Sequence, residues 1–251
     1  MTATAPAPSR RSPAPSDMNR VLAALPRAVR AAVTPHLVSV RLEYGEVVAE
    51  AGVPMRWAYF PDSAVFSIVA EMSDGSVAEA GTVGREGFVG LPLVLGVVAA
   101  PFKCFVQGAG EARRISASAL RQLVQEHASL RSLLLKCAHS FLCQVAQTAA
   151  CNALHPIGER CARWLLMTDD RARGEASLDG APASFDLTQE ALAYMLGVRR
   201  EGVSSAARGL RSAGLIQFSR GRVTVIDRRG LEKAACECYA VIRSEHQRVL
   251  G

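Results

Sequence analysis

The chain has 251 residues, enough for one large domain or two smaller domains with a substantial core. Hydrophobic residues make up 49% and charged residues 21%, a composition that excludes a disordered or collagen-like protein. The formal net charge is +6, and residues 187–229, with eight arginines and three acidic residues, alone carry +5. This local charge indicates a polyanionic partner, although a solvated basic surface is the simpler alternative.

No stretch has the pattern of a membrane anchor or an export signal. Residues 88–102 are the most apolar uncharged stretch, but glycine and proline interrupt it and it is too short to span a bilayer. Residues 1–20 lack the apolar segment of a secretory signal and offer almost nothing to bury, so we expect a disordered tail there. These patterns predict a cytoplasmic protein with no membrane partner.

The seven cysteines include no C-x-x-C pair, and their odd number is poor material for a disulfide framework. We interpret most of them as small buried hydrophobic residues, and we assign no metal site. A redox or metal role for Cys236 and Cys238, which form a C-x-C pair, is the less favoured alternative.

A short helix is expected at residues 21–33, and the pattern changes at residue 37. From there to residue 115, short apolar runs alternate with turn residues, and Ser73-Asp74-Gly75 between two such runs predicts a hairpin. Many short strands at this spacing predict a sandwich or a closed barrel such as a jelly roll. The expected strands are residues 37–42, 47–49, 57–61, 64–72, 77–83, 104–108 and 110–115.

Helical periodicity begins at residue 117. Residues 117–126 predict a short helix, and residues 128–153 predict a long helix whose apolar stripe is too extensive for one small domain. We therefore expect the long helix to pair with a second copy of itself, and packing on the barrel of its own chain is the alternative. The stripe consists of Leu130, Leu133, Leu134, Cys137, Phe141, Val145 and Ala149. Another helix is expected at residues 156–168, followed by a polar surface loop at residues 168–184.

The most informative motif lies within residues 187–226. Thr188 can cap a helix at residues 189–196, and a second helix is expected at residues 199–211. Two apolar runs, residues 215–218 and 222–226, flank the basic tip Ser219-Arg220-Gly221 and predict a hairpin, the wing of a winged helix. The corner of a helix-turn-helix needs small and apolar residues at fixed offsets, here Ala193, Gly197, Val198, Val203 and Ala206.

The outward face of the second expected helix is polar. Arginine can bind guanine in a bidentate manner, glutamate can accept a hydrogen bond from cytosine, and serine suits phosphate contacts. Together with the wing, which offers Arg220 and Arg222, this face predicts binding to double-stranded DNA, with two packed core helices as the alternative. The outward residues are Arg199, Arg200, Glu201, Ser204, Ser205 and Arg208.

The order of barrel, long helix and winged helix, with the motif L-T-Q-E-x-L-A-x-x-L-G-V-x-R-E-x-V at residues 187–203, resembles the Crp/Fnr family of bacterial transcription regulators. The resemblance covers about residues 25–235 and is most specific in this motif. It implies a sensor barrel, a homodimer formed through residues 128–153, and a near-palindromic operator whose half-sites lie about one helical turn of DNA apart. It also implies RNA polymerase as a protein partner.

The resemblance also gives roles to single residues. Arg200, Glu201 and Ser205 match the positions with which the family reads bases, and Thr188, Gln189 and Arg199 match phosphate contacts. The cyclic-AMP branch has arginine at the position of Ser205, so we expect an altered half-site. The predicted α+β protein thus has a tail (1–20), a jelly-roll β-barrel (21–126), a long dimerisation helix (127–154), a winged helix-turn-helix domain (155–235) and a C-terminal helical tail (236–251).

The barrel departs from the family's cyclic-nucleotide pattern. Cyclic-nucleotide binders of the family use a G-E pair for the ribose and a later R-S/T-A triplet for the phosphate. Here Leu91 stands in place of the glutamate and Ala99-Ala100-Pro101 in place of the triplet, and using Glu86 in a shifted register would not restore the arginine. A buried phosphate without its cation is costly, so we expect no cyclic-AMP response and assign no cofactor. The apolar insert at residues 91–100 is expected to fill the barrel.

Other classes of function fit less well. A cupin-like metal enzyme would need a His-x-His pair on the barrel, but no histidine lies between His36 and His127, so we expect no enzyme. No cysteine precedes Cys104 to form the family's iron–sulfur centre, and His36 and Cys104 lack a haem-ligand signature. The remaining alternative is a regulatory small-molecule-binding module that acts on another protein. The sequence leaves open the effector, the operator, the target genes and the direction of regulation.

Overall fold

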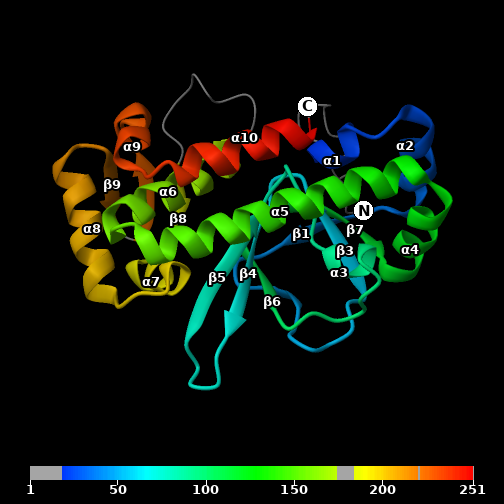
Figure 1. Cartoon of the computed structure of the whole chain (residues 1–251), viewed down its shortest axis with the longest axis horizontal. Helices are drawn as coiled ribbons and strands as arrows, with labels where there is room; N and C mark the ends of the chain where they lie inside the picture. Colours follow the sequence, from blue (N-terminus) through cyan, green and yellow to red (C-terminus); the bar gives the residue numbers. More distant parts are fainter. Residues whose placement is uncertain (1–18, 174–183, 220, 251) are drawn as a thin grey trace, which may run out of the picture.

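The computed structural model describes residues 19–173, 184–219 and 221–250. Figure 1 shows a β domain and a helical domain joined by one long helix, α5 (Ala128–Leu154), which runs past both. This is the α+β organisation that the sequence predicts. Within the described ranges, no helix has both the length and the apolar character that a membrane crossing needs.

Two antiparallel sheets form the β domain. The first sheet has the strand order β1 (Val38–Leu42), β7 (Gly110–Ser116), β3 (Trp57–Pro61). The second sheet has the strand order β2 (Val47–Ala49), β6 (Lys103–Gly108), β4 (Val65–Glu71), β5 (Val77–Val83). Tyr59 and Ala112 of the first sheet share one core with Phe66 and Val106 of the second. Side chains of both sheets therefore point into a common interior.

The N-terminal part of this domain differs from the prediction. The expected helix at residues 21–33 is instead two short helices, α1 (Arg20–Ala23) and α2 (Arg27–Val33), and the 3-10 turn η2 (Thr34–His36) follows them. Pro26 lies between the two helices, and its ring cannot continue a helix begun before it. Asn19, expected in the tail, is fully buried, and its amide donates to the carbonyl oxygens of Pro61 and Gly87, each at 2.9 Å. The tail boundary therefore lies before Asn19, and residues 1–18 lie outside the described residues.

The long helix α5 presents two apolar faces, and the first half of the predicted stripe lies on the inward one. Leu130, Leu134 and Cys137 are buried in one core with α4 (Ala117–Glu126) and the first sheet. The interpretation of this stripe as a self-pairing surface is therefore wrong for these residues, because the core of the same chain covers them, whereas Val145 farther along the stripe is half-buried and Ala149 is exposed. A second apolar stripe on α5 faces outward: the exposed fractions of Leu135 and Leu142 are 42% and 64%.

The helical domain contains the predicted winged helix-turn-helix elements around a single core. Its helices are α6 (Ile157–Arg173), α7 (Gln189–Leu196), α8 (Arg200–Ser212) and α9 (Arg228–Ala234). A three-stranded sheet has the order β8 (Ser184–Asp186), β10 (Arg222–Val225), β9 (Ile216–Ser219). The sequence prediction contains only the last two strands. Leu165, Leu192, Val203 and Val223 are among the fully buried side chains that join these elements.

Helix α6 extends beyond its predicted end at residue 168. Asp169, which was expected in a surface loop, is fully buried and forms an ion pair with Arg228 of α9 at 2.6 Å. This distant partner stabilises a last helical turn that local polarity does not predict. The rest of the expected loop, residues 174–183, lies outside the described residues.

The expected C-terminal helical tail is helix α10 (Cys238–Leu250). It lies beside α5 and runs back from the helical domain toward the β domain (Figure 1). Val249 and Leu250 at its end pack against the core that contains α4 and the first sheet. The two ends of the described chain therefore meet near the same side of the β domain.

Candidate nucleic-acid interface

The corner between α7 and α8 has the geometry of a helix-turn-helix. The Thr188 side-chain oxygen accepts a hydrogen bond from the backbone N–H of Ala191 at 3.0 Å and so caps α7. Gly197 ends α7 with a φ of 60°, a left-handed conformation in which a side chain would be strained. The backbone N–H of Val198 then donates to the carbonyl of Ala193 at 3.1 Å, which fixes the direction in which α8 departs.

Helix α8 is held by its buried face. Val203, Ala207 and Leu210 are buried, in register with the helical repeat. Gly202 lies where α8 meets α6, and a Cβ at this position would stand 3.0 Å from the Ile157 side chain. The small residue therefore permits a close approach of the two helices, and α8 cannot rotate about its axis without losing this packing.

The opposite face of α8 carries most of the predicted DNA contacts to the surface. The exposed residues of this face are Arg199, Arg200, Glu201, Ser205 and Arg208. Ser204 is only half-buried and donates a hydrogen bond to Gln189 of α7 at 2.7 Å, and this contact holds the two helices together at their outer edge. The structure thus places the exposed predicted residues of α8 on one surface. The side chains of Ser204 and Gln189 instead bond to each other.

The wing extends beside this surface. Arg222 of β10 is exposed and forms an ion pair with Asp186 of β8 at 3.1 Å. Arg220, predicted at the wing tip, lies outside the described residues. Strand β8 supplies the third strand of the wing sheet, pairing Phe185 with Val223. A three-residue strand is too short for a periodic signal, although the alternation Ser184-Phe185-Asp186 is compatible with one.

Glu86 lies in the segment where the sequence analysis looked for the cyclic-nucleotide cassette, and its side chain is engaged by the protein itself. Glu86 forms a buried ion pair with Arg171 of α6, with a shortest N–O distance of 2.7 Å. Burial raises the pKa of the Glu86 carboxyl, but the Arg171 guanidinium, His246 and backbone N–H donors together outweigh burial, and the pKa lies below its usual value. Glu86 also accepts a hydrogen bond from the backbone N–H of Gly84 at 3.1 Å. This carboxylate therefore links the β domain to α6 of the helical domain.

Two cavities of different size lie beside this ion pair. The cavity lined by Glu86, Phe88 and Leu91, and closed by His246 and Leu250 of α10, holds only about 20 Å³. A larger neighbouring cavity of about 160 Å³ opens between the β domain, α6 and α10. Four arginines line it, together with acidic residues: Arg20, Arg85, Arg171 and Arg243.

The apolar insert at residues 91–100 does not fill the barrel as expected. It begins with the short helix α3 (Leu91–Val94), of which Leu93 is buried. The side chains that follow, Leu95, Val97 and Val98, are 59%, 50% and 53% exposed. The expectation therefore holds for the first turn only, because the chain after α3 turns back along the surface.

A second buried carboxylate joins the two domains, and sequence reasoning missed it. Glu79 of β5 accepts hydrogen bonds from the indole N–H of Trp164 at 2.8 Å and from the Ser67 hydroxyl at 2.7 Å. Burial raises the pKa of this carboxyl above its usual value. Trp164 belongs to α6, so its hydrogen bond to Glu79 connects the helical domain to the β4–β5 hairpin. This polar contact lies among buried apolar side chains. The partners are 85 residues apart, so no local pattern indicates the contact.

These features define a class of architecture: an N-terminal β domain, a long connecting helix and a C-terminal winged helix-turn-helix domain. Residues 159–234 match the Crp-like helix-turn-helix domain, and this part of the chain is such a domain. The predicted resemblance to the Crp/Fnr transcription regulators is therefore confirmed. No curated protein matches the chain.

Solved structures show the same fold over most of the chain. A CRP/FNR family transcriptional regulator from Thermus thermophilus is 20% identical, with a TM-score of 0.62 over 79% of this chain and 98% of its own. FixK2 from Bradyrhizobium japonicum is 15% identical, with a TM-score of 0.64 over 80% and 98%. The c-di-GMP responsive global regulator CLP from Xanthomonas campestris is 20% identical, with a TM-score of 0.61 over 80% and 99%. At these identities the likeness is one of fold.

Proposed function

We propose that the chain is a homodimeric transcription regulator that binds a specific, near-palindromic DNA site. The observation that carries this proposal is the exposed face of α8, where arginine, glutamate and serine side chains stand on a helix whose opposite face is fixed in the domain core. A helix presented in this way fits the major groove of B-DNA.

The proposed roles follow from where each side chain stands. Arg200, Glu201 and Ser205 lie on the first turns of α8 and read base edges, whereas Arg199 and Arg208 flank them and contact phosphates. Thr188 stands at the N-terminus of α7, where backbone N–H groups favour a phosphate oxygen. Arg222 in the wing contacts a neighbouring phosphate.

The proposed dimer forms through the outward stripe of α5, which shares only Ala149 with the stripe that the sequence indicated. Leu135 and Leu142 lie one heptad apart and are followed at the same spacing by Ala149. Such a stripe on a long helix is the seam of a two-helix coiled coil, and small residues near its end let two helices approach closely. A two-fold axis along this seam would place two α8 helices in successive major grooves.

Cyclic AMP is not the proposed effector. Glu86 is already paired with Arg171, and the smaller of the two cavities that it lines, about 20 Å³, is too small for a nucleotide. We expect isothermal titration with cyclic AMP to give no heat of binding, whereas tight saturable binding would overturn this part of the proposal.

The experiment that tests DNA binding is selection of bound duplexes from a random pool by the full-length protein, with and without cell extract. The expected result is an enriched motif of two inverted half-sites whose centres lie about one helical turn apart. Enrichment only in the presence of extract would show that an effector is required. A pool without any enriched motif under both conditions would overturn the proposal.

A further inference from the structure

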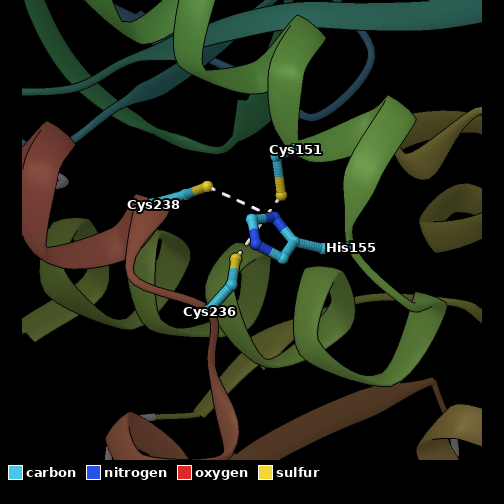
Figure 2. Close-up of side chains that lie close together, drawn as sticks. All are labelled: Cys151, His155, Cys236 and Cys238. Carbon is cyan, nitrogen blue, oxygen red and sulfur yellow. Dashed lines mark hydrogen bonds between the residues drawn. The ribbon is translucent and has the colours of Figure 1, made fainter.

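A cluster of four metal-ligating side chains lies where the long helix ends. Cys151 is in the last turn of α5 and His155 follows that helix, whereas Cys236 and Cys238 stand between α9 and the start of α10. Figure 2 shows all four side chains pointing toward one another from these two chain segments. One sulfur or nitrogen atom from each residue lies within 4.8 Å of the corresponding atom of every other.

The distances are those of a tetrahedral site. The sulfur atoms of Cys151 and Cys236 are 3.5 Å apart, and the sulfur of Cys238 lies 3.5 Å from Nδ1 of His155. Zinc binds sulfur at about 2.3 Å and nitrogen at about 2.0–2.1 Å, so two ligands of one tetrahedral zinc ion lie roughly 3.5–3.8 Å apart. We propose that Cys151, His155, Cys236 and Cys238 together bind one zinc ion.

The surroundings complete the site in the way that zinc sites require. The second ring nitrogen of His155, Nε2, lies 3.3 Å from a carboxylate oxygen of Glu237, which orients the ring and holds Nδ1 toward the sulfurs. The side-chain amide of Gln147 donates a hydrogen bond to the sulfur of Cys238 at 3.1 Å. An N–H donor aimed at a cysteine sulfur favours a thiolate, the form that binds metal.

Charge and burial support the same conclusion. Three thiolates and a neutral histidine around a divalent cation carry a net charge of −1. Arg160 and Arg163 of α6 are buried and lie close enough to Cys151 to interact with it electrostatically. The Nε atoms of both guanidinium groups have no hydrogen-bond partner in the described part of the chain. Two buried cations beside the cluster therefore offset its charge.

These cysteines differ from the other buried cysteines of the chain. Cys104, Cys137 and Cys161 each lie in a large hydrophobic core among aliphatic and aromatic side chains. By contrast, Cys151, Cys236 and Cys238 form a buried cluster of their own. The metal role that the sequence leaves as the less favoured alternative for Cys236 and Cys238 is thus the one that the geometry supports, because folding adds Cys151 and His155 to the pair.

The ligand set selects zinc over other metals. Three thiolates and one imidazole are soft or borderline ligands, which exclude calcium and magnesium. A cluster of several iron atoms would hold its thiolates farther apart, because sulfide ions lie between the metals. Four protein ligands leave no open position, so the site is structural and not catalytic.

The position of the site indicates what the zinc ion stabilises. It would connect the end of α5 to the start of α10, directly before the chain enters α6 and the DNA-binding domain. Cys151 and Cys236 are 85 residues apart in sequence, so the metal would close a long loop that contains the whole helix-turn-helix. Removal of zinc is therefore expected to loosen the junction between the two domains.

The first test measures metal in the full-length protein purified under reducing conditions. We expect about one zinc per chain by elemental analysis, and in metal-depleted protein we expect cobalt to give the absorption bands of a tetrahedral thiolate site. The cobalt spectrum reports the ligands of the wild-type protein directly and does not depend on a variant that folds. A reduced protein that holds no zinc and gives no such spectrum would overturn the proposal.

Variants identify the ligands. The double variant Cys236→Ser/Cys238→Ser is expected to lose the bound zinc, and His155→Ala to alter the cobalt spectrum, because a nitrogen ligand is lost. Glu237→Gln, which leaves all four ligands in place, should weaken zinc binding roughly 10–100-fold. Cys143→Ser is the matched control, since this half-buried cysteine lies on α5 outside the cluster, and it should keep the full zinc content. Loss of zinc in Cys143→Ser with retention in the double variant would contradict the assignment.

Discussion

Arginine and leucine side chains have different roles in the interior and on the surface of this molecule. The side chains of Arg171 and Arg228 are largely buried, only 5% and 17% exposed, and both form ion pairs with acidic residues from other elements. Arg199, Arg200 and Arg208 stand exposed on one side of α8. The long helix α5 repeats the contrast with apolar residues, since one stripe fills the core and the other faces solvent.

The contrast teaches that local charge is a poor measure of a binding surface. The +5 of residues 187–229 includes Arg228, which lies in the domain interior, where it neutralises Asp169. The charge on the proposed DNA-binding surface is therefore smaller than the sequence count, but it is concentrated on one helix face and the wing. Four changes test this division, and we expect the largest effects on the inward side.

Removing a largely buried arginine should lower the free energy of unfolding, and we expect this to be the largest of the four effects. Arg228→Ala takes the cation from Asp169, a carboxylate with no solvent exposure, and also removes a hydrogen bond to Tyr239 at 2.6 Å. We expect the free energy of unfolding to fall by roughly 3–5 kcal/mol, measured by urea denaturation at neutral pH. Arg229→Ala, the exposed neighbour, should change it by less than about 0.5 kcal/mol. Equal losses for the two variants would show that Arg228 has no special role.

The outward stripe of α5 should give the next largest effect. Leu142→Glu places a charge in the proposed dimer seam, and two buried leucines are lost for each dimer. At about 1.5 kcal/mol or more for each leucine, we expect the dimer dissociation constant to rise roughly a hundredfold or more, measured by sedimentation velocity. Leu95→Glu is the matched control, because Leu95 is similarly exposed but lies on the β domain. A Leu142→Glu protein that stays dimeric would place the interface elsewhere.

The sequence predicts the local elements well and the long-range ones poorly. The strands 57–61 and 77–83 and the helices 117–126 and 189–196 have the predicted bounds, because alternation, helical periodicity and caps such as Thr188 are local signals. The strand β8 and the last turn of α6 were missed, since each depends on a distant partner. For α6 that partner is Arg228, which no pattern near Asp169 indicates.

The candidate sites show the same limit. The outward residues of α8 could be found from the sequence, because a helix-turn-helix fixes which positions face away from its core. The choice between the two stripes of α5 could not, since a heptad-like pattern does not say which side meets the barrel. The cluster that unites Cys151 with Cys236 also needs the fold, because its halves lie 85 residues apart.

Among the DNA-facing residues, Arg200 should matter most. Arg200→Ala removes the proposed bidentate contact with a base, so specific binding should weaken by about 1–3 kcal/mol and the preference at one base pair of each half-site should relax. Competition binding with a set of single-base operator variants measures both effects. The same loss on specific and random DNA would reassign Arg200 to a phosphate contact.

A substitution in the wing should give the smallest effect on DNA binding. Unlike Arg200→Ala, it should weaken binding to all sequences and leave the base preference unchanged. Arg222 is exposed, and its ion pair with exposed Asp186 contributes little to stability, so the side chain is available for a phosphate. In Arg222→Ala we expect weaker binding to all sequences alike and a slope of log affinity against log salt that is smaller by about 1. Gln217→Ala on the neighbouring strand β9 removes no charge and should leave the slope unchanged. A loss confined to one operator sequence would instead place Arg222 in contact with a base, and the readout of bases would then extend beyond α8.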